Sequence, residues 1–323
     1  MTTNTLISII IPVLNGAQFL DRCYSTLTNQ EYPNLEVIFV DNGSIDNSLD
    51  VINNYCSMHN NYRLITCKEK GPGSARNRGI EDAKGDFISF LDVDDELAPD
   101  KFILLLDAFS KYPNAGMVVG NTIKEYADGR KYKLDLGPMK VGINKAPFPG
   151  LLWLQHLMVN PTTCSYLVKS DVFKEEHIEF SKIPYGEDIA LNVCIGLKYD
   201  VAFIENTVCI YHRHMQSNIS ISNTKISPLE RYYRFYEGFA LKKFYPNKNI
   251  YPSSIAYKIS EGNAYRFLQK LIKVERKKYY INTLNDLKKK SLLSNSISRN
   301  LLYYILPYYI ADFISEKLNK VSY

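Results

Sequence analysis

Three carboxylates within four residues, Asp92, Asp94 and Asp95, have the residue types and the spacing of a cation site. They directly follow a short apolar run, residues 87–91, which has the pattern of a buried strand. Carboxylates this close repel one another, and a divalent cation such as Mg2+ or Mn2+ relieves the repulsion and can bridge the phosphates of a nucleotide. The alternative is a solvated acidic turn before a helix. Their position at the end of a buried strand favours the metal site.

Two earlier apolar runs also end in residues that could bind a ligand. Residues 6–13 form a β-branched run that Pro12 terminates, and residues 35–40 form a second run that ends at Asp41. An Asp before Asn-Gly often caps a turn, and this alternative applies to Asp41. Two strands of one sheet that both end in carboxylates nevertheless predict a shared polar pocket.

The segment between these carboxylates, residues 71–79, is rich in glycine and carries Arg76 and Arg78. Its glycines allow the backbone to approach a ligand, Ser74 can cap a helix, and a helix start with arginines would attract a diphosphate. It is not a Walker loop, because no Gly-Lys-Ser/Thr follows, and it is not the GxGxxG turn of a first Rossmann helix. Its position one strand before the carboxylates makes it a candidate diphosphate site.

These residues need strands and helices that alternate along the chain. Apolar residues recur at helical spacing after residue 17 and after residue 48, and residues 62–67 and 116–120 have strand patterns. This alternation implies βαβ units, so the sequence predicts an α/β fold with a mostly parallel sheet flanked by helices. Ligands bind such sheets beyond the carboxyl ends of the strands.

Further strands are predicted at residues 163–168, 201–204 and 207–211, and two more polar clusters accompany them. Glu187 and Asp188 precede an apolar helical stripe, and the helix dipole alone can explain acids at a helix start. Two histidines around an arginine follow the last predicted strand, in the segment His212-Arg213-His214. A lone histidine there would be structural, whereas this cluster suits a loop that closes over a diphosphate and its metal.

The composition is that of a globular protein, with 46% apolar residues in 323. The six cysteines show no CxxC pair and no metal-ligand spacing, as expected of reduced residues in a cytoplasmic protein. The first apolar run is too short for a signal peptide or a membrane span. We therefore expect a cytoplasmic location.

Four segments together resemble the ordered signatures of glycosyltransferase family 2, as found in bacterial polysaccharide synthesis. They are residues 8–15, 40–44, 74–79 and 91–95. The resemblance implies the GT-A fold, which is a Rossmann-like α/β fold, a sugar-nucleotide donor, and inversion of the anomeric centre. Four motifs in register are more specific than any one of them.

The resemblance also implies roles on the donor side. Asp41 would contact the nucleobase, Arg76 the diphosphate side and Asp92 the ribose, and Pro12 would lie in the same nucleotide-sugar site. The family often has a second acid after the one at 41. This chain has Asn42 there, a departure that we expect to be harmless.

The same resemblance assigns the metal and the base. Asp94 would bind a divalent metal, Mn2+ or Mg2+, with Asp95 as a helper. Asp188 matches the aspartate of the family's late Glu-Asp motif and would be the general base. His214 matches a late basic position and would reach the diphosphate and the metal.

The predicted function is therefore transfer of a sugar from a nucleoside diphosphate sugar, a UDP-sugar in this expectation, to a hydroxyl of a glycan or a lipid-linked acceptor. Two alternatives remain open: a nucleotidyltransferase, and a non-catalytic nucleotide-sugar-binding or scaffold protein. Nucleic acid is not an expected partner, because the front part of the chain is acidic and no binding module is present.

Charge suggests where the chain divides. From residue 226 onward there are 18 Lys and Arg against 7 Asp and Glu, and before it 21 against 27. We expect residues 1–120 to form the nucleotide-sugar-binding half of the GT-A domain, residues 121–225 the acceptor-binding and catalytic-base half, and residues 226–323 a helical C-terminal appendage.

The C-terminal region allows two interpretations. Its most apolar piece, residues 299–311, is too short to span a bilayer, and the lysines at 288–290 are close to it. Aromatic and basic residues together fit a helix on an anionic membrane, here the inner face of the cell membrane. The alternative is an ordinary helical subdomain with a solvated basic face and a homodimer contact.

Overall fold

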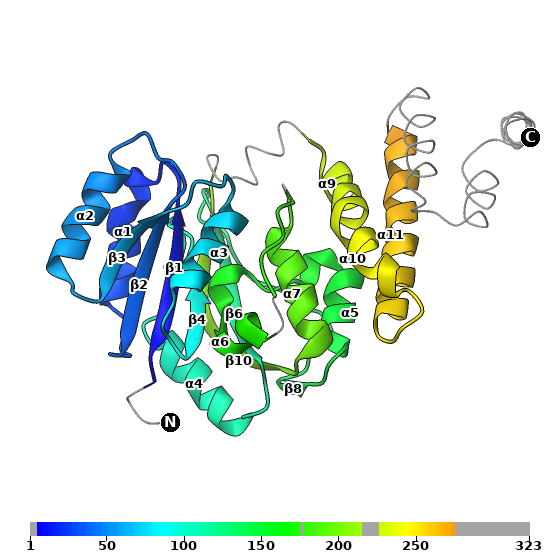
Figure 1. The fold of residues 1–323 in the computed structure, drawn as a ribbon, viewed down its shortest axis with the longest axis horizontal. Coiled ribbons are helices and arrows are strands. Elements are labelled where there is room, and N and C mark those ends of the chain that lie inside the picture. The colour runs from blue at the N-terminus through cyan, green and yellow to red at the C-terminus, as the bar shows by residue number, and fades with distance from the viewer. Residues whose placement is uncertain (1–4, 176–177, 184, 215–225, 275–323) are drawn as a thin grey trace, which may run out of the picture. The chain divides into compact units, whose positions relative to one another are not determined.

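The computed structural model of the chain describes residues 5–175, 178–183, 185–214 and 226–274 (Figure 1). Internal contacts divide the chain into two compact units, residues 1–224 and 225–323. The first unit contains a sheet and helices, and the second is helical over most of its described part. Within the described ranges, no helix is long and apolar enough to cross a membrane.

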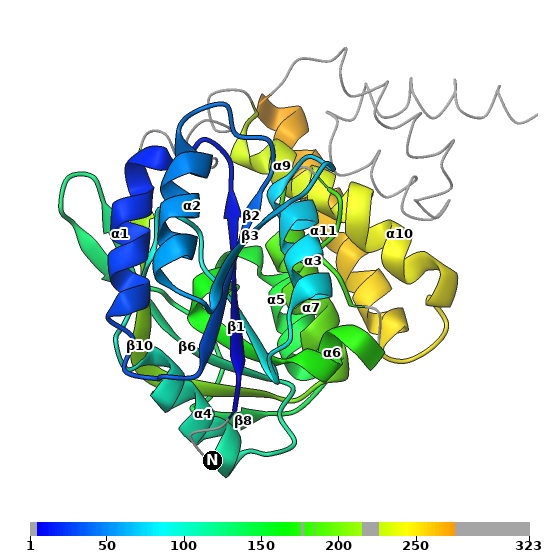
Figure 2. The same cartoon turned by 60° about the vertical axis from the view of Figure 1, so that its left-hand side comes forward.

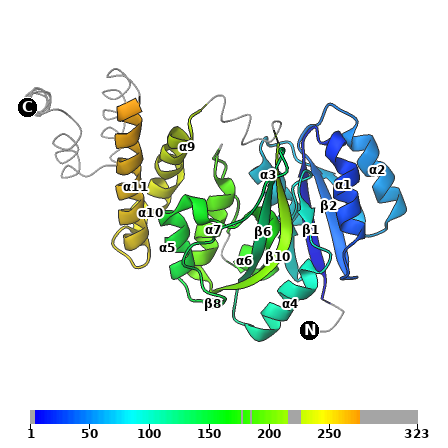
Figure 3. The same cartoon turned by 180° about the vertical axis from the view of Figure 1, so that it is seen from behind.

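One mixed sheet organises the first unit. Its strands are β1 (Ile7–Val13), β2 (Leu35–Asp41), β3 (Tyr62–Thr66), β4 (Phe87–Phe90), β5 (Glu96–Leu97), β6 (Met117–Tyr126), β7 (Lys131–Lys133), β8 (Gly142–Asn144), β9 (Tyr166–Lys169) and β10 (Val201–Arg213). The order in the sheet is β3-β2-β1-β4-β9-β6-β10-β5, with β7 beside β6 and β8 beside β10. Seen from behind in Figure 3, β6 and β10 lie side by side.

Most of these strands point the same way. β1 is parallel to β2 and β4, β2 is parallel to β3, and β6 is parallel to β10. β9 is antiparallel to both β4 and β6, so β6 and β10 run in the direction of β4. The carboxyl ends of β1, β2, β3, β4, β6 and β10 therefore lie at one edge of the sheet, here called the carboxyl edge. The predicted α/β fold with a mostly parallel sheet is confirmed.

Helices cover both faces of the sheet (Figure 2). They are α1 (Ala17–Thr28), α2 (Ser48–Met58), α3 (Pro72–Asp82), α4 (Lys101–Lys111), α5 (Phe148–Gln155), α6 (Ser170–Glu175) and α7 (Glu187–Lys198). α1 and α2 lie on one face, and α3, α5, α6 and α7 lie on the other. α4 shares the face of α1, because Phe102 and Leu105 of α4 join Leu20 of α1 in one buried cluster.

The strand sequences reflect this double cover. β1 and β2 are nearly continuous apolar runs because both of their faces are buried. Ile9 and Phe39 belong to the cluster under α1, α2 and α4. Ile10 and Val40 point to the other face, where Gly79 of α3 lies against them. A side chain at Gly79 would collide with Ile10, so this glycine allows the close approach of α3 to the sheet.

Three predicted details are wrong. The strand predicted at residues 163–168 begins only at Tyr166, because a turn of 3-10 helix precedes it. The strands predicted at 201–204 and 207–211 are the single strand β10, in which register shifts let the pairing with β6 continue past a polar stretch. Ser74 lies inside the first turn of α3 and makes no capping hydrogen bond.

The second unit is built from α9 (Pro228–Phe235), a short π-helix (Tyr236–Ala240), α10 (Leu241–Phe244) and α11 (Ser253–Val274). The Tyr236 ring stacks on Phe267, and its hydroxyl accepts a hydrogen bond of 2.8 Å from Asn263. The described part is therefore helical, as predicted. The predicted membrane segment at 299–311 and the lysines at 288–290 lie outside the described residues.

Candidate active site

The loops that follow β1 and β2 are tied together at the carboxyl edge. The backbone N–H of Asn15 donates to Ser44 Oγ at 3.0 Å, and the Asn15 side-chain oxygen accepts the N–H of Ile45 at 2.8 Å. Asn15 has a left-handed backbone, φ 52°, which asparagine tolerates better than most residues. An open cavity of about 400 Å³ lies at these loops, lined by Asn15, Ala17, Gln18, Asp46 and Asn47. A cavity therefore opens at the edge where a ligand is predicted.

Asp41 caps the turn that ends β2. Its two carboxylate oxygens accept the backbone N–H groups of Gly43 and Ser44, both at 3.0 Å. This is the capping alternative that the sequence allowed, and the contact of Asp41 with a nucleobase stays a prediction. Pro12 pairs in register with Val40 inside the sheet, so β1 continues one residue beyond it. The place of Pro12 in a nucleotide-sugar site also stays a prediction.

Asn42 joins the end of β2 to the segment before α3. Its amide donates to the carbonyls of Cys67 and Glu69 at 3.1 and 2.7 Å, and its side-chain oxygen accepts the N–H of Gly71 at 2.8 Å. Lys70 donates to the Asn42 carbonyl at 3.0 Å. A carboxylate cannot donate the two amide bonds. An amide in place of a second acid therefore has a structural use in this chain.

Arg76, on α3, is buried between two carboxylates. One terminal nitrogen donates to Asp92 at 2.6 Å and the other to Glu187 at 3.1 Å. Its guanidinium carbon lies 5.2 Å from the centre of the Phe180 ring, within cation–π distance. Burial alone would lower the pKa of Arg76, but the two carboxylates raise it above its ordinary value. Arg76 thus links the end of β4 to the start of α7, and its contact with a diphosphate stays a prediction.

The segment in front of α7 is held against α3. The Asn77 side chain donates to the Phe180 carbonyl at 2.9 Å and accepts the Phe180 N–H at 2.8 Å. Gly73 lies so close to this segment that a side chain there would press against Glu187 and the Ser181 carbonyl. These contacts hold the start of α7 beside the carboxylates that follow β4.

Glu187 and Asp188 open α7, after Gly186 in a left-handed conformation with φ 79°. Burial raises the pKa of Glu187 to about 7; the charge of Asp188 adds to this shift and Arg76 opposes it. Burial also raises the pKa of Asp188, although its Oδ1 accepts the Ile189 N–H at 2.8 Å. A carboxylate with a raised pKa takes up a proton more readily, which is the property of a general base.

Asp94 and His214 meet where β4 and β10 end. His214 Nε2 lies 2.9 Å from Asp94 Oδ2, and the His214 ring packs against Phe19 with 4.8 Å between ring centres. Arg22 of α1 donates to the Asp94 carbonyl at 2.5 Å. Burial, followed by the charge of Asp92, raises the pKa of Asp94. The fold thus brings together the two residues that the sequence assigned to the metal.

Asp95 and His212 fasten the same region. Asp95 is buried and accepts the backbone N–H of His212 at 3.0 Å, and His212 Nε2 lies 2.7 Å from Glu96 Oε1. Burial raises the pKa of Asp95 well above its ordinary value. These bonds attach the end of β10 to the segment after Asp94. Asp95 and His212 therefore hold the backbone next to Asp94 and His214 in place.

Residues 8–175 match the family model described as "Glycosyl transferase family 2". The chain belongs to glycosyltransferase family 2. Members of this family are enzymes that transfer sugars with inversion of the anomeric centre. The predicted family is therefore confirmed.

Two curated relatives show how far the similarity extends. A Haemophilus influenzae protein named "Uncharacterized glycosyltransferase" is 45% identical over 97 residues, which are 30% of this chain and 39% of that protein. A Rickettsia typhi protein, also named an uncharacterized glycosyltransferase, is 28% identical over 291 residues, which are 87% of this chain and 83% of that protein. This chain therefore spans less than two thirds of the first relative and most of the second.

Solved structures share the fold. Residues 1–349 of Staphylococcus aureus TarS, in complex with UDP-GlcNAc, have a TM-score of 0.62 at 16% identity, over 92% of this chain and 78% of that one. The mannosyltransferase PcManGT of Pyrobaculum calidifontis, in complex with GDP-Man and Mn2+, has a TM-score of 0.53 at 16% identity, over 97% and 87%. The predicted GT-A-like fold is confirmed.

Metal binding by this family 2 protein would depend on Asp94 and His214. Among the residues that the structure describes, no three His, Cys, Asp or Glu side chains form a ready metal site. A carboxylate oxygen and an imidazole nitrogen both suit Mn2+, and a cation held by few protein ligands completes its shell with substrate phosphates and water. The two side chains therefore fit a cation that binds together with a diphosphate.

Sequence reasoning missed the residues that hold the site together. It did not predict the pairing of Arg76 with Glu187, or the contacts of Asn77 and Phe180 that support it. One signal was available. An arginine on a helix that packs against a sheet needs carboxylates close by, and the two Asp/Glu clusters of the chain were the candidates.

Proposed function

We propose that this protein transfers a sugar from a UDP-sugar to a hydroxyl of a glycan or a lipid-linked acceptor, with inversion. The observation that carries the proposal is the bridge that Arg76 forms between Asp92 and Glu187. It connects Asp92, which is assigned to donor binding, with the pair Glu187 and Asp188, of which Asp188 is assigned to proton transfer. The complex of TarS with UDP-GlcNAc supports a uridine nucleotide.

Asp188 is the general base in this proposal. Its carboxylate takes the proton of the acceptor hydroxyl while the hydroxyl oxygen forms a bond to the anomeric carbon. The bond between that carbon and the diphosphate oxygen breaks, and its electron pair leaves with the nucleoside diphosphate. Attack from the opposite face inverts the configuration. The raised pKa of Asp188 favours uptake of the proton, which returns to solvent after the product leaves.

The donor would lie along the carboxyl edge. Asp92 accepts hydrogen bonds from the ribose hydroxyls, and Arg76 holds its carboxylate in position for them. Asp41 contacts the base from the end of β2, and Pro12 lies on the neighbouring strand. In this arrangement the charge of Arg76 also attracts the diphosphate.

Asp94 and His214 would hold Mn2+ or Mg2+. A bound cation neutralises charge on the departing diphosphate. Phe19 packs on the His214 ring and Arg22 donates to the backbone carbonyl of Asp94, so the ring and the backbone at Asp94 are held in place. The Mn2+ in the PcManGT complex supports this assignment.

The variant Asp188→Asn tests the proposal, because asparagine keeps the shape of the side chain but cannot take the proton. We expect UDP release from a panel of UDP-sugars and glycan acceptors to fall at least about 100-fold, with the affinity for UDP unchanged. Asp171→Asn, the same change in the first turn of α6, should alter neither quantity. Transfer at the wild-type rate by Asp188→Asn would place the base elsewhere.

The UDP-release assay and a pyrophosphate-release assay together separate the two alternatives. A non-catalytic protein would bind UDP-sugars but release no UDP with any acceptor. A nucleotidyltransferase would instead release pyrophosphate from a nucleoside triphosphate and a sugar phosphate.

We also propose that the second unit contacts an anionic membrane surface. Exposed apolar side chains gather around the connection between α10 and α11, namely those of Tyr245, Ile250, Tyr251 and Ile255. Residues 238–260 contain four lysines and no Asp or Glu. Apolar and basic side chains on one surface are the combination that binds anionic lipid headgroups.

Sedimentation with vesicles tests this second proposal. The full chain should sediment with phosphatidylglycerol vesicles and not with phosphatidylcholine vesicles, and Ile250→Asp should abolish the binding. Met158→Asp, at an exposed apolar position of the first unit, is the matched control and should bind as the wild type does. Self-association in solution without vesicle binding would assign the surface to a homodimer contact.

A further inference from the structure

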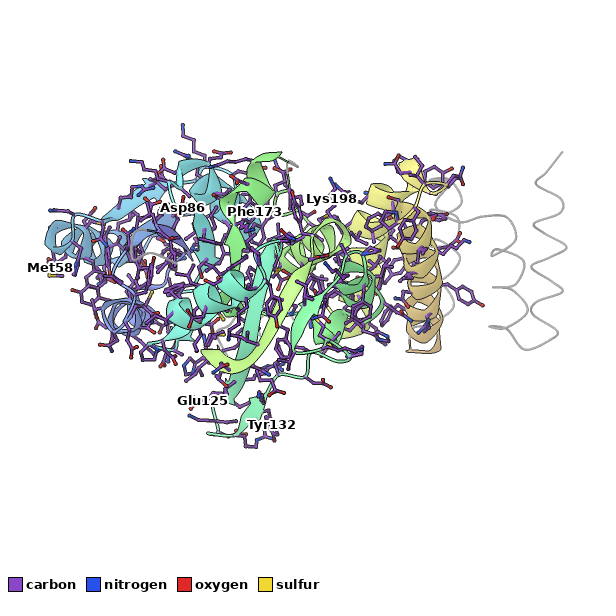
Figure 4. The ribbon with its side chains drawn as sticks, turned by 90° about the horizontal axis from the view of Figure 1, so that it is seen from below. Met58, Asp86, Glu125, Tyr132, Phe173 and Lys198 are labelled. Carbon is purple, nitrogen blue, oxygen red and sulfur yellow. The ribbon has the colours of Figure 1, made fainter. Side chains whose placement is uncertain are left out.

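The hairpin of β6 and β7 stands at the carboxyl edge, next to the site. β6 ends at Tyr126, and its parallel pairing with β10 sets Tyr126 beside Arg213 and Lys124 beside Tyr211. Arg213 immediately precedes His214, which contacts Asp94. Figure 4 shows Glu125 and Tyr132 at the end of this hairpin, which projects from the body of the first unit.

Three cations surround one aromatic ring in this hairpin. The distances to the centre of the Tyr126 ring are 5.6 Å for Lys124, 5.4 Å for Arg130 and 5.6 Å for Arg213. Lys124 also lies 5.6 Å from the centre of the Tyr211 ring. All of these distances lie within the range of cation–π contacts. The cluster of Lys124, Tyr126, Arg130, Tyr211 and Arg213 is called the hairpin cluster below.

The charges of the hairpin cluster are not balanced. Arg130 pairs with Asp128 at 2.6 Å, and Lys131 on the same hairpin pairs with Glu125 at 3.0 Å. Within the described part of the chain, no ion pair with a carboxylate is found for Lys124 or Arg213. Like charges gathered on one ring repel one another, so an anion bound among them would be stabilised.

The hairpin cluster borders the proposed reaction centre. Tyr211 and Arg213 lie in the last paired stretch of β10, directly before His214, whose Nε2 is 2.9 Å from Asp94 Oδ2. The cluster is also open to solvent on the hairpin side, where the Arg130 side chain is 62% exposed and Tyr132 is 52% exposed. A ligand bound there would extend from the reaction centre toward solvent.

We propose that the hairpin cluster is an acceptor subsite that binds a negatively charged glycan, through a carboxylate or a phosphate group on the acceptor. Lys124 and Arg213 pair with the anionic group, because arginine matches the geometry of carboxylate and phosphate oxygens. Tyr132 is 52% exposed and its ring centre lies 5.8 Å from that of Tyr126, so the ring would pack against a sugar ring of the same acceptor. The inference rests on the proposed transfer reaction and names the class of its acceptor.

Binding of three defined oligomers tests the inference. Trigalacturonate carries carboxylates, a trimer of glycerol phosphate carries phosphates, and maltotriose is neutral. We expect the wild type to bind at least one anionic oligomer more tightly than maltotriose, and the better one identifies the anion. In Lys124→Met/Arg213→Met the dissociation constant of that oligomer should rise at least about 10-fold, as expected when charge-assisted hydrogen bonds are lost.

Two comparisons make the result specific. Lys133→Met changes a lysine of the same hairpin that donates to the Glu205 carbonyl, and it should leave the dissociation constant unchanged. Rising salt should weaken binding of the anionic oligomer to the wild type and leave maltotriose unaffected. This second measurement does not depend on the folding of any variant.

UDP binding in the presence of Mn2+ is measured on the same samples and should not change in the double variant. Loss of UDP affinity in the double variant would overturn the inference, because the cluster would then serve the donor diphosphate. Equal binding of maltotriose and the anionic oligomers would overturn it as well. A wild type that binds an anionic oligomer but no nucleotide would refute the proposed transfer reaction. The anion subsite itself would still be supported.

Discussion

Removing the charge of Arg76 should destabilise the first unit strongly. In Arg76→Met the unbranched stem is kept, but Asp92 and Glu187 lose the cation that bonds them at 2.6 and 3.1 Å. Loss of one partner from a buried ion pair costs about 3–5 kcal/mol. The Asp92 and Glu187 side chains are 29% and 15% exposed, so water compensates part of the loss. We therefore expect the free energy of unfolding to fall by about 3 kcal/mol.

The loss of unfolding free energy in Arg76→Met should be smaller at acid pH. The pKa of Glu187 is raised to about 7 although Arg76 opposes the shift, so it should rise further in Arg76→Met. With a raised carboxyl pKa, the folded state holds a proton that the unfolded state has released. This stabilisation is present at low pH and is lost as the pH rises through the folded pKa. The difference between wild type and Arg76→Met should thus be larger at about pH 8 than at about pH 5.5.

Urea unfolding measures both effects. Trp153 is the single tryptophan of the chain and is buried in the first unit, so its fluorescence reports this transition. The matched control is Arg78→Met, because the Arg78 side chain is 40% exposed and its ion-pair distances are 3.5 and 3.8 Å. It should change the free energy of unfolding by less than about 0.5 kcal/mol. Equal losses in the two variants, or a loss in Arg76→Met that is independent of pH, would show that Arg76 does not stabilise the fold by neutralising Asp92 and Glu187.

Three other substitutions test polar side chains of the first unit. Asn42→Asp should lower the free energy of unfolding by about 1–3 kcal/mol at neutral pH, because a carboxylate would face two carbonyls, and urea unfolding measures the loss. Asn77→Ala removes both bonds to Phe180 and should cost about 2 kcal/mol in the same assay, and no change would mean that the segment before α7 is held by other contacts. Burial lowers the pKa of Lys101 to about 8, so Lys101 contributes stability that grows between about pH 8 and its ordinary pKa of 10.5. Buried cysteines and tyrosines with raised pKa values act in the opposite direction over this range, so the quantity to measure is the difference in free energy of unfolding between the wild type and Lys101→Met, which should shift in favour of the wild type as the pH rises.

The sequence predicts the sheet well because its signal is local. β1, β2 and β4 are nearly continuous apolar runs, and each is followed by residues that the parallel topology must bring to the same edge. For this reason Asp41 and Asp92 could be assigned to one edge without a structure. The strand β10 was divided in two because Glu205 and Asn206 interrupt its apolar pattern, whereas bulges let the real strand continue.

Pairings between distant residues could not be predicted in the same way. Arg76 and Glu187 are 111 positions apart, and their contact depends on how α3 and α7 pack. Lys101 shows the same limit, since a lysine at the start of an amphipathic helix is expected at the surface. It is instead buried and donates to Ser89 and to the Cys164 carbonyl, both at 2.8 Å.

Metal-dependent nucleotide binding is measured as thermal stability with and without Mn2+. UDP, UDP-sugars and the corresponding guanosine nucleotides are compared on the wild type and on Asp94→Asn, which removes one proposed metal ligand. We expect a uridine nucleotide to raise the unfolding temperature of the wild type only when Mn2+ is present, by an amount equivalent to about 2.7 kcal/mol at 100 times its dissociation constant. The shift should disappear in Asp94→Asn. No shift with any nucleotide, or a shift that needs neither Mn2+ nor Asp94, would contradict metal-dependent binding of a uridine nucleotide at this site.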